Sequence, residues 1–162
     1  MNDERRTIDI LDLQEGRGPV PVLDARGARE LLRDARRIAV VGASPNPSRP
    51  SNDVMAYLLD QGYDCVPINP VAEQVLGIRT FPDLASAVAA GGPFDIVDVF
   101  RRAELTPDVA RQAVATGSRA LWLQLGIVSW EAAAIAAAGG LPVVMDRCSK
   151  IEHHALRLPR PR

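Results

Sequence analysis

Five short, predominantly apolar runs recur along the chain, and each is followed by a small or polar residue. The runs occupy residues 38–41, 65–68, 95–100, 120–125 and 141–145. Continuous short runs of this kind are typical of strands that are buried on both faces of a parallel sheet. Pro67 lies inside the second run, which indicates an edge strand or a bulge, because proline cannot donate to a neighbouring strand.

Stretches with the helical spacing of apolar residues separate these runs. In the first, Asp24 can cap a helix, and Ala28, Leu32 and Ala35 fall on one face. We expect helices over residues 24–36, 51–61, 83–89, 106–116 and 130–138. Strands that alternate with helices predict parallel βαβ units with right-handed crossovers. The pattern therefore predicts one doubly wound α/β domain with a parallel sheet of about five strands.

The chain ends are less informative. Residues 1–23 form an N-terminal arm, in which residues 7–13 suit either a short strand or a helical turn before the glycines and proline of 16–19. Packing of this arm on the domain and packing on a second subunit are both open. We expect the domain to span residues 24–156 and the Pro/Arg-rich residues 157–162 to form a frayed tail.

Composition narrows the class of protein. The 162 residues carry a net charge of −1, so no overall basic field indicates a nucleic-acid partner. No apolar run approaches the roughly 20 residues of a membrane span, and the acidic N-terminus does not match a secretory signal. Two cysteines make no disulfide framework. We expect a cytoplasmic protein that does not bind membranes.

Small or polar residues follow every predicted strand. Because the carboxyl ends of parallel strands meet at one edge of the sheet, ligands bind there, at the point where the strand order reverses. The candidate residues at this edge are Ala43, Ser44, Asn69, Arg101, Arg102, Gln124, Gly126, Arg147 and Cys148.

The turn after the first strand favours a phosphate ligand. Gly42-Ala43-Ser44 lacks the third glycine of a dinucleotide fingerprint, and the chain has no P-loop motif. Asn69 follows the second strand, where an NAD site would place an acidic residue for the ribose, so NAD is less favoured. Ser44, Arg49 and Ser51, with Asn52, surround a predicted helix N-terminus, which suits a phosphate or pyrophosphate.

Together these residues resemble the small stand-alone CoA-binding proteins, which are similar to the CoA-binding domain of the succinyl-CoA synthetase α subunit. The resemblance runs from about Ala28 to Leu156 and rests on an ordered set of motifs. These are Arg37-Ile38-Ala39-Val40-Val41-Gly42-Ala43-Ser44 with Arg49-Pro50-Ser51, Ile68-Asn69-Pro70, Val97-Asp98-Val99-Phe100-Arg101, Leu121-Trp122-Leu123-Gln124-Leu125-Gly126 and Val144-Met145-Asp146-Arg147-Cys148.

The resemblance implies a Rossmann-like fold with coenzyme A as the ligand. By it, the turn of Gly42, Ala43 and Ser44 holds the pyrophosphate, and Arg49 and Ser51 add phosphate contacts. Asn69 and Pro70 would line the nucleotide, Phe100 and Arg101 would border the pocket, and the pantetheine arm would pass Gln124 and Gly126. Relatives often carry a basic residue shortly after the Asn-Pro pair, whereas Val71 and Ala72 stand here. We expect one phosphate contact to be missing.

The sequence favours binding over catalysis. Cys148 is a weak nucleophile candidate beside Arg147, with a small buried hydrophobe as the alternative, and Cys65 is assigned to the core. His153 and His154 are adjacent, so they do not share one ligand on a helix; we expect exposed histidines and no metal site. Asp95 and Asp98 have opposite parity on their strand, which predicts capping or solvated roles.

Three functions follow from these observations. The preferred one is non-catalytic binding of coenzyme A or an acyl-CoA, a small-molecule ligand. The first alternative is an enzyme, or an enzyme subunit, that acts on acyl-CoA through Cys148 or through a partner. The weaker alternative is an NAD(P)-binding redox regulator. A homo-oligomer is compatible with each of them.

Overall fold

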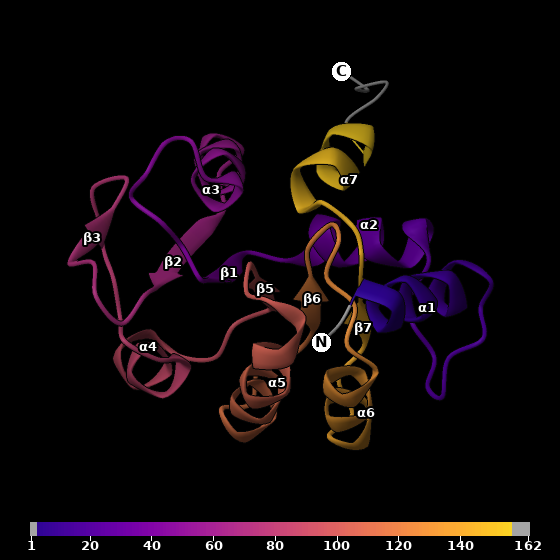
Figure 1. Ribbon diagram of the computed structural model, residues 1–162. Coiled ribbons are helices and arrows are strands. Elements are labelled where there is room, and N and C mark those ends of the chain that lie inside the picture. The colour runs from indigo at the N-terminus through magenta and orange to yellow at the C-terminus, as the bar shows by residue number, and fades with distance from the viewer. Residues whose placement is uncertain (1–2, 157–162) are drawn as a thin grey trace.

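The apolar runs of the sequence form one parallel sheet in the computed structural model, which describes residues 3–156 (Figure 1). The predicted doubly wound, five-stranded α/β domain is confirmed. The strands are β1 (Arg37–Val41), β2 (Asp64–Ile68), β5 (Ile96–Val99), β6 (Leu121–Leu123) and β7 (Val143–Val144), in the spatial order β2-β1-β5-β6-β7.

The strand order reverses between β1 and β5. The chain moves from β1 outward to β2 and then returns to the other side of β1 with β5. Val41 lies opposite both Ile68 and Val99, so the carboxyl ends of the three strands stand level. Pro67 lies on β2, an edge strand of this sheet, as its sequence context predicts. A short antiparallel hairpin of β3 (Gln74–Val75) and β4 (Ile78–Arg79) was not predicted.

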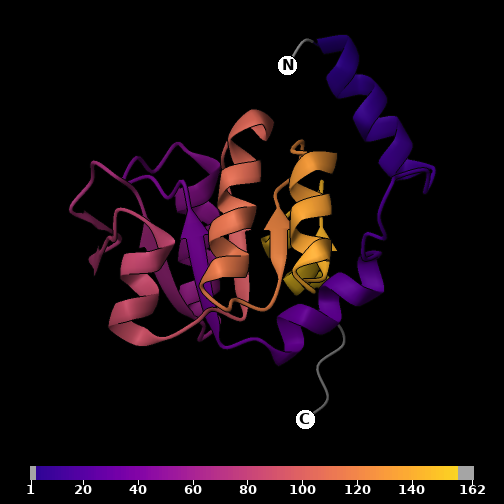
Figure 2. The same cartoon turned by 90° about the horizontal axis from the view of Figure 1, so that it is seen from below.

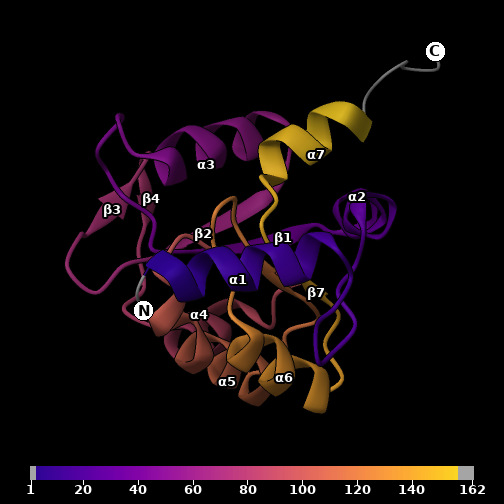
Figure 3. The ribbon, with the colours of Figure 1, turned by 45° about the vertical axis from the view of Figure 1, so that its right-hand side comes forward.

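Helices cover both faces of the sheet (Figure 3). One face carries α2 (Ala25–Asp34), α3 (Pro50–Asp60) and α7 (Ser149–Leu156), and the other carries α4 (Leu84–Gly91), α5 (Thr106–Ala115), which follows the 3-10 turn η1 (Ala103–Leu105), and α6 (Trp130–Ala138). Figure 2 shows α5 and α6 side by side, in agreement with their close packing. Because both faces are covered, nearly every strand residue is apolar and buried.

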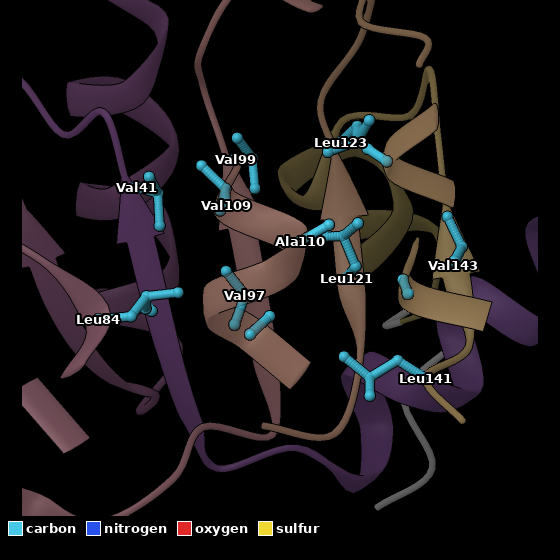
Figure 4. Close-up of a cluster of buried hydrophobic side chains, with 14 of the residues drawn as sticks. Val41, Leu84, Val97, Val99, Val109, Ala110, Leu121, Leu123, Leu141 and Val143 are labelled. Carbon is cyan, nitrogen blue, oxygen red and sulfur yellow. The ribbon is translucent and has the colours of Figure 1, made fainter. Parts of the chain in front are cut away.

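Each face of the sheet has its own cluster of buried hydrophobic residues, and the two clusters contain alternate residues of the strands. On β1, Ala39 and Val41 face the helices α4 to α6, whereas Ile38 and Val40 face α2 and α3, since successive strand residues point to opposite faces. Figure 4 shows part of the first of these clusters, to which β1 contributes Val41, β5 contributes Val97 and Val99, and α5 contributes Val109 and Ala110.

The N-terminal arm forms helix α1 (Asp3–Gln14), which settles the choice between strand and helical turn. Asp3 and Glu4 lie in its first turn, where negative charge interacts favourably with the helix dipole. Arg6 donates to the carbonyl of Gly126 (3.1 Å), and Ile10 packs against the core, so this helix packs on its own domain. Within residues 3–156, none of the helices has the length and hydropathy to cross a bilayer. The predicted tail, residues 157–162, lies outside the described residues.

Candidate functional site

A cavity of about 800 Å³ opens at the carboxyl ends of β1, β5 and β6. This is the place where the strand order reverses and where open α/β sheets leave a crevice for ligands. The lining residues are Gly42, Ala43, Ser44, Arg49, Pro50, Ser51, Val54, Asn69, Pro70, Phe100, Arg101, Arg102, Leu105, Gln124, Leu125, Ile127, Cys148 and Ile151.

Gly42 allows the turn after β1 to approach β5 closely. Its φ of +83° lies in the left-handed region, which glycine adopts without the steric cost that a Cβ brings. A Cβ built on Gly42 would lie 2.9 Å from the carbonyl oxygen of Phe100. Backbone conformation and space both require glycine here, and the close approach forms one wall of the cavity.

Side chains from two other elements hold this turn in place. The Ser44 amide donates to Ser51 Oγ (3.1 Å), and the Asn52 side-chain amide donates to the Ser44 carbonyl (3.0 Å). Asn69 Nδ2 donates to the Ala43 carbonyl (2.7 Å). The start of α3 and the end of β2 therefore fix the backbone between Gly42 and α3.

Helix α3 begins at the cavity with an uncapped N-terminus. Pro50 occupies its first turn, where the missing amide costs nothing, and Arg49 precedes it without a side-chain capping hydrogen bond. Pro50 has no amide and the Asn52 amide donates to the Arg49 carbonyl (3.0 Å), so this end offers an anion the Ser51 amide and the helix dipole. The carboxyl edge of the sheet thus offers a phosphate-sized anion a backbone cradle.

The charges around the cavity have one sign. Arg49, Arg101 and Arg102 line it, and no Asp or Glu belongs to its lining among residues 3–156. Arg102 lies 3.7 Å from Glu104, whereas Arg49 and Arg101 form no ion pair within the described part of the chain. Since the whole chain carries a net charge of −1, this positive field is local. It suits a ligand with several negative charges.

A buried polar network lies behind the cavity wall. Gln124 Nε2 donates to Asp98 Oδ1 (2.5 Å) and to Ser149 Oγ (2.9 Å), while Ser149 Oγ donates to Asp98 Oδ2 (2.8 Å). Burial raises the pKa of Asp98 to about 7, although the hydrogen bonds from Gln124 and Ser149 act in the opposite direction. The network joins β5, β6 and the first residue of α7.

Asp95 has the predicted capping role, whereas Asp98 does not. Asp95 accepts the amides of Arg36 and Arg37 (2.9 and 3.0 Å) at the start of β1, which is a capping role. Asp98 is fully buried, so the expectation of a capping or solvated aspartate is wrong there. The sequence contained one signal of this burial, because Asp98 is an acidic residue inside an otherwise apolar run.

Arg147, a further candidate at this edge, does not line the cavity and lies 3.4 Å from Glu152. All but one of the residues assigned to the coenzyme A site line the cavity. The exception is Gly126, whose amide donates to Asp146 Oδ1 (2.7 Å) and whose carbonyl accepts from Arg6. Asn69 lines the cavity, but its side chain is engaged by the Ala43 carbonyl and by the amides of Val71 and Ala72. Asn69 therefore shapes the site through the backbone that it holds.

The cysteines and histidines take distinct positions. Cys148 is partly exposed and lines the cavity, whereas Cys65 is buried, and burial raises the pKa of its thiol to about 12. His154 is exposed as expected, but His153 is buried, with its Nδ1 2.9 Å from the hydroxyl of Tyr57, which corrects that expectation. No cluster of metal-ligating side chains occurs within residues 3–156.

The cavity also has an apolar part that the sequence did not reveal. Leu105, Leu125, Ile127 and Ile151 contribute to it from η1, from the loop after β6 and from α7. Leucines and isoleucines in loops and helix ends carry no sequence signal of a shared cavity, because the fold alone brings them together.

The chain is similar to known proteins in sequence and in structure. A family model described as a CoA binding domain matches residues 36–154. The protein YneT of Bacillus subtilis (strain 168), described as uncharacterized, is 39% identical over 125 residues, which cover 77% of this chain and 90% of YneT.

Two solved structures illustrate the range of the fold. A hypothetical protein from Pyrococcus horikoshii OT3 has a TM-score of 0.77 and 38% identity, over 83% of this chain and 92% of that one. An acetyl-coenzyme A synthetase 1 of Ca. Korarchaeum cryptofilum has a TM-score of 0.63 and 23% identity, over 72% of this chain and 27% of that one. At that identity the second comparison shows a shared fold.

Proposed function

The chain belongs to the CoA-binding domain family, and from this premise we propose that it binds coenzyme A or an acyl-CoA without catalysing a reaction. The ligand occupies the cavity at the carboxyl edge of the sheet. The observation that carries the proposal is the lining of this cavity, which combines three arginines, no carboxylate and an open helix N-terminus within the described residues.

Coenzyme A matches the two kinds of surface in the cavity. Its pyrophosphate and ribose phosphate carry several negative charges, whereas its pantetheine arm is long and largely uncharged. In the proposed pose the pyrophosphate lies on the turn of Gly42 to Ser44, at the N-terminus of α3. Arg49 adds a charged contact at the same end.

The remainder of the ligand follows the sheet edge away from this turn. Pro70 and the Asn69 backbone border the nucleotide, and Phe100 and Arg101 form the wall above β5. The pantetheine arm passes Gln124 toward Cys148.

Loss of one arginine tests this pose. We expect Arg49→Ala to weaken CoA binding by about 1–3 kcal/mol, the range for a hydrogen bond to a charged group, as measured by titration calorimetry. Arg111→Ala is the matched control, because Arg111 is exposed on α5, pairs with Glu131 and does not line the cavity. Unchanged affinity in Arg49→Ala removes Arg49 from the site, and absence of CoA binding in the wild type contradicts the function.

The ribose phosphate requires its own titration. Val71 and Ala72 provide no cation after Asn69 and Pro70. We therefore expect dephospho-CoA to bind within a few-fold of CoA. Much weaker binding of dephospho-CoA would assign that phosphate to another cation of the chain.

A second candidate function is supported by the position of Cys148. Its partly exposed thiol lines the cavity, where it would attack an acyl-CoA thioester, take the acyl group and release free CoA. Release of CoA from acetyl-CoA by the wild type, and its loss in Cys148→Ser, would favour this enzyme over a binding protein.

A further inference from the structure

Three exposed apolar side chains line the cavity. Leu105, Leu125 and Ile151 are 39%, 63% and 58% exposed, and all three line it. They are three of the seven exposed large hydrophobic residues in the described chain, so this cavity holds an unusual share of them. Apolar side chains that are exposed together on one surface mark a binding site for an apolar group.

Leu125 and Ile127, which follow β6, lie away from the phosphate end. Ser44 and Arg49 follow β1, whereas Leu125 follows β6, which is two strands further along the sheet. Neighbouring strands are about 4.8 Å apart, so roughly 10 Å of the sheet edge separates the two ends. A ligand with its pyrophosphate on the Gly42 turn therefore directs its other end toward Leu125.

We propose that the apolar part, formed by Leu105, Leu125, Ile127 and Ile151, receives the acyl chain of an acyl-CoA thioester. The preferred ligand is then an aliphatic acyl-CoA and not free CoA. This inference rests on the proposed function, since it requires the phosphates of the same ligand to occupy the arginine-lined end.

The arrangement of the side chains favours an acyl chain as the occupant. They come from η1, the loop after β6 and α7, and they line the same cavity as Arg49 and Arg101. The apolar surface is thus continuous with the positive surface, and a molecule with an anionic head and an aliphatic end matches both. No carboxylate belongs to the lining of this cavity among the described residues.

A series of ligands tests the proposal. Titration calorimetry would compare acetyl-, butanoyl-, hexanoyl- and octanoyl-CoA below their micellar concentrations, so that the thioester stays constant and chain length alone varies. We expect affinity to rise by about two- to fourfold for each methylene that is buried. A flat series in a protein that binds CoA would overturn the acyl site and leave the proposed function intact, whereas absence of any binding would count against the proposed function itself.

Substitutions at the apolar part provide the second arm. Leu125→Ser and Ile151→Ser should reduce the ratio of octanoyl-CoA affinity to acetyl-CoA affinity severalfold, and both side chains are exposed enough to be replaced without loss of the fold. Leu76→Ser is the matched control, because Leu76 is 43% exposed but lies outside the cavity. An unchanged ratio of the two affinities in both variants would refute the proposal. It would also be refuted if affinity did not change with chain length and the protein formed a dimer that Leu125→Ser abolishes, because the apolar surface would then bind a second copy of the chain.

Discussion

Asp98→Asn should remove a pH dependence that the buried network imposes on the stability of the domain. Asp98 is fully buried on β5, and its carboxylate accepts hydrogen bonds from Gln124 and Ser149. Burial disfavours the carboxylate and raises the pKa of Asp98 to about 7. Asparagine has nearly the same shape and never ionises, so it isolates this titration.

The linkage of protons to folding sets the sign and the size of the effect. The unfolded pKa of Asp98 is 3.8 and its folded pKa is about 7, so between these values the folded state binds more protons. The free energy of unfolding therefore falls as pH rises: the stabilisation is complete below the unfolded pKa and is lost as pH passes through the folded pKa. For these two values the loss between pH 5 and pH 8 is about 2–3 kcal/mol.

Urea unfolding at several pH values between 5 and 8 measures this effect. The free energy of unfolding of the wild type should fall by about 2–3 kcal/mol more than that of Asp98→Asn. The other titrating groups are the same in both proteins, so their contributions cancel in the difference between the two free energies of unfolding. Asp95→Asn is the control, because hydrogen bonds from the amides of Arg37 and Arg36 help to lower the pKa of Asp95, so it titrates below this window. Parallel pH profiles for wild type and Asp98→Asn would refute the reasoning.

Three further substitutions or reagents test the cavity. Gly42→Ala should destabilise the fold by roughly 1–2 kcal/mol in urea unfolding and weaken CoA binding, since its φ is +83° and the Cβ meets the Phe100 carbonyl. Ser44→Asp should abolish CoA binding, because its carboxylate takes the place of the pyrophosphate; retained binding in the folded variant would move the site. CoA disulfide should exchange with the Cys148 thiol, with release of one CoA thiol, to give a mass adduct that dithiothreitol reverses. That adduct should be lost in Cys148→Ser and kept in Cys65→Ser; labelling of Cys65 alone would contradict the pose.

The strands and their faces were predictable because burial on both sides of a parallel sheet leaves a local pattern. Pro67 indicated an edge strand or a bulge because proline has no amide to donate, and the structure places it on an edge strand. The order of the strands did not follow from periodicity, since the same runs are compatible with several arrangements. The sequence did not decide whether the segment of α1 forms a strand or a helical turn, because its apolar residues are few and its packing depends on distant partners such as the Gly126 carbonyl.

The strand ends indicated the edge of the sheet at which the candidate site lies, and the turn after β1 indicated the class of ligand. The stretch from Gly42 to Ser51 carries small residues, hydroxyls and a guanidinium around a helix start, which indicates an anion from sequence alone. Asp98 was misjudged because its partners Gln124 and Ser149 are 26 and 51 residues away. Leu125 and Ile151 were missed because their common cavity depends on the packing of α7 beside α3.

Native mass spectrometry of the purified protein, incubated with equimolar CoA, dephospho-CoA and NAD, tests the central claim most directly. We expect a complex that retains the mass of CoA or dephospho-CoA, or of an acyl-CoA carried through purification, and we expect the Ser44→Asp variant to lose this mass. Preferential retention of NAD, or binding of CoA that Ser44→Asp leaves intact, would contradict it.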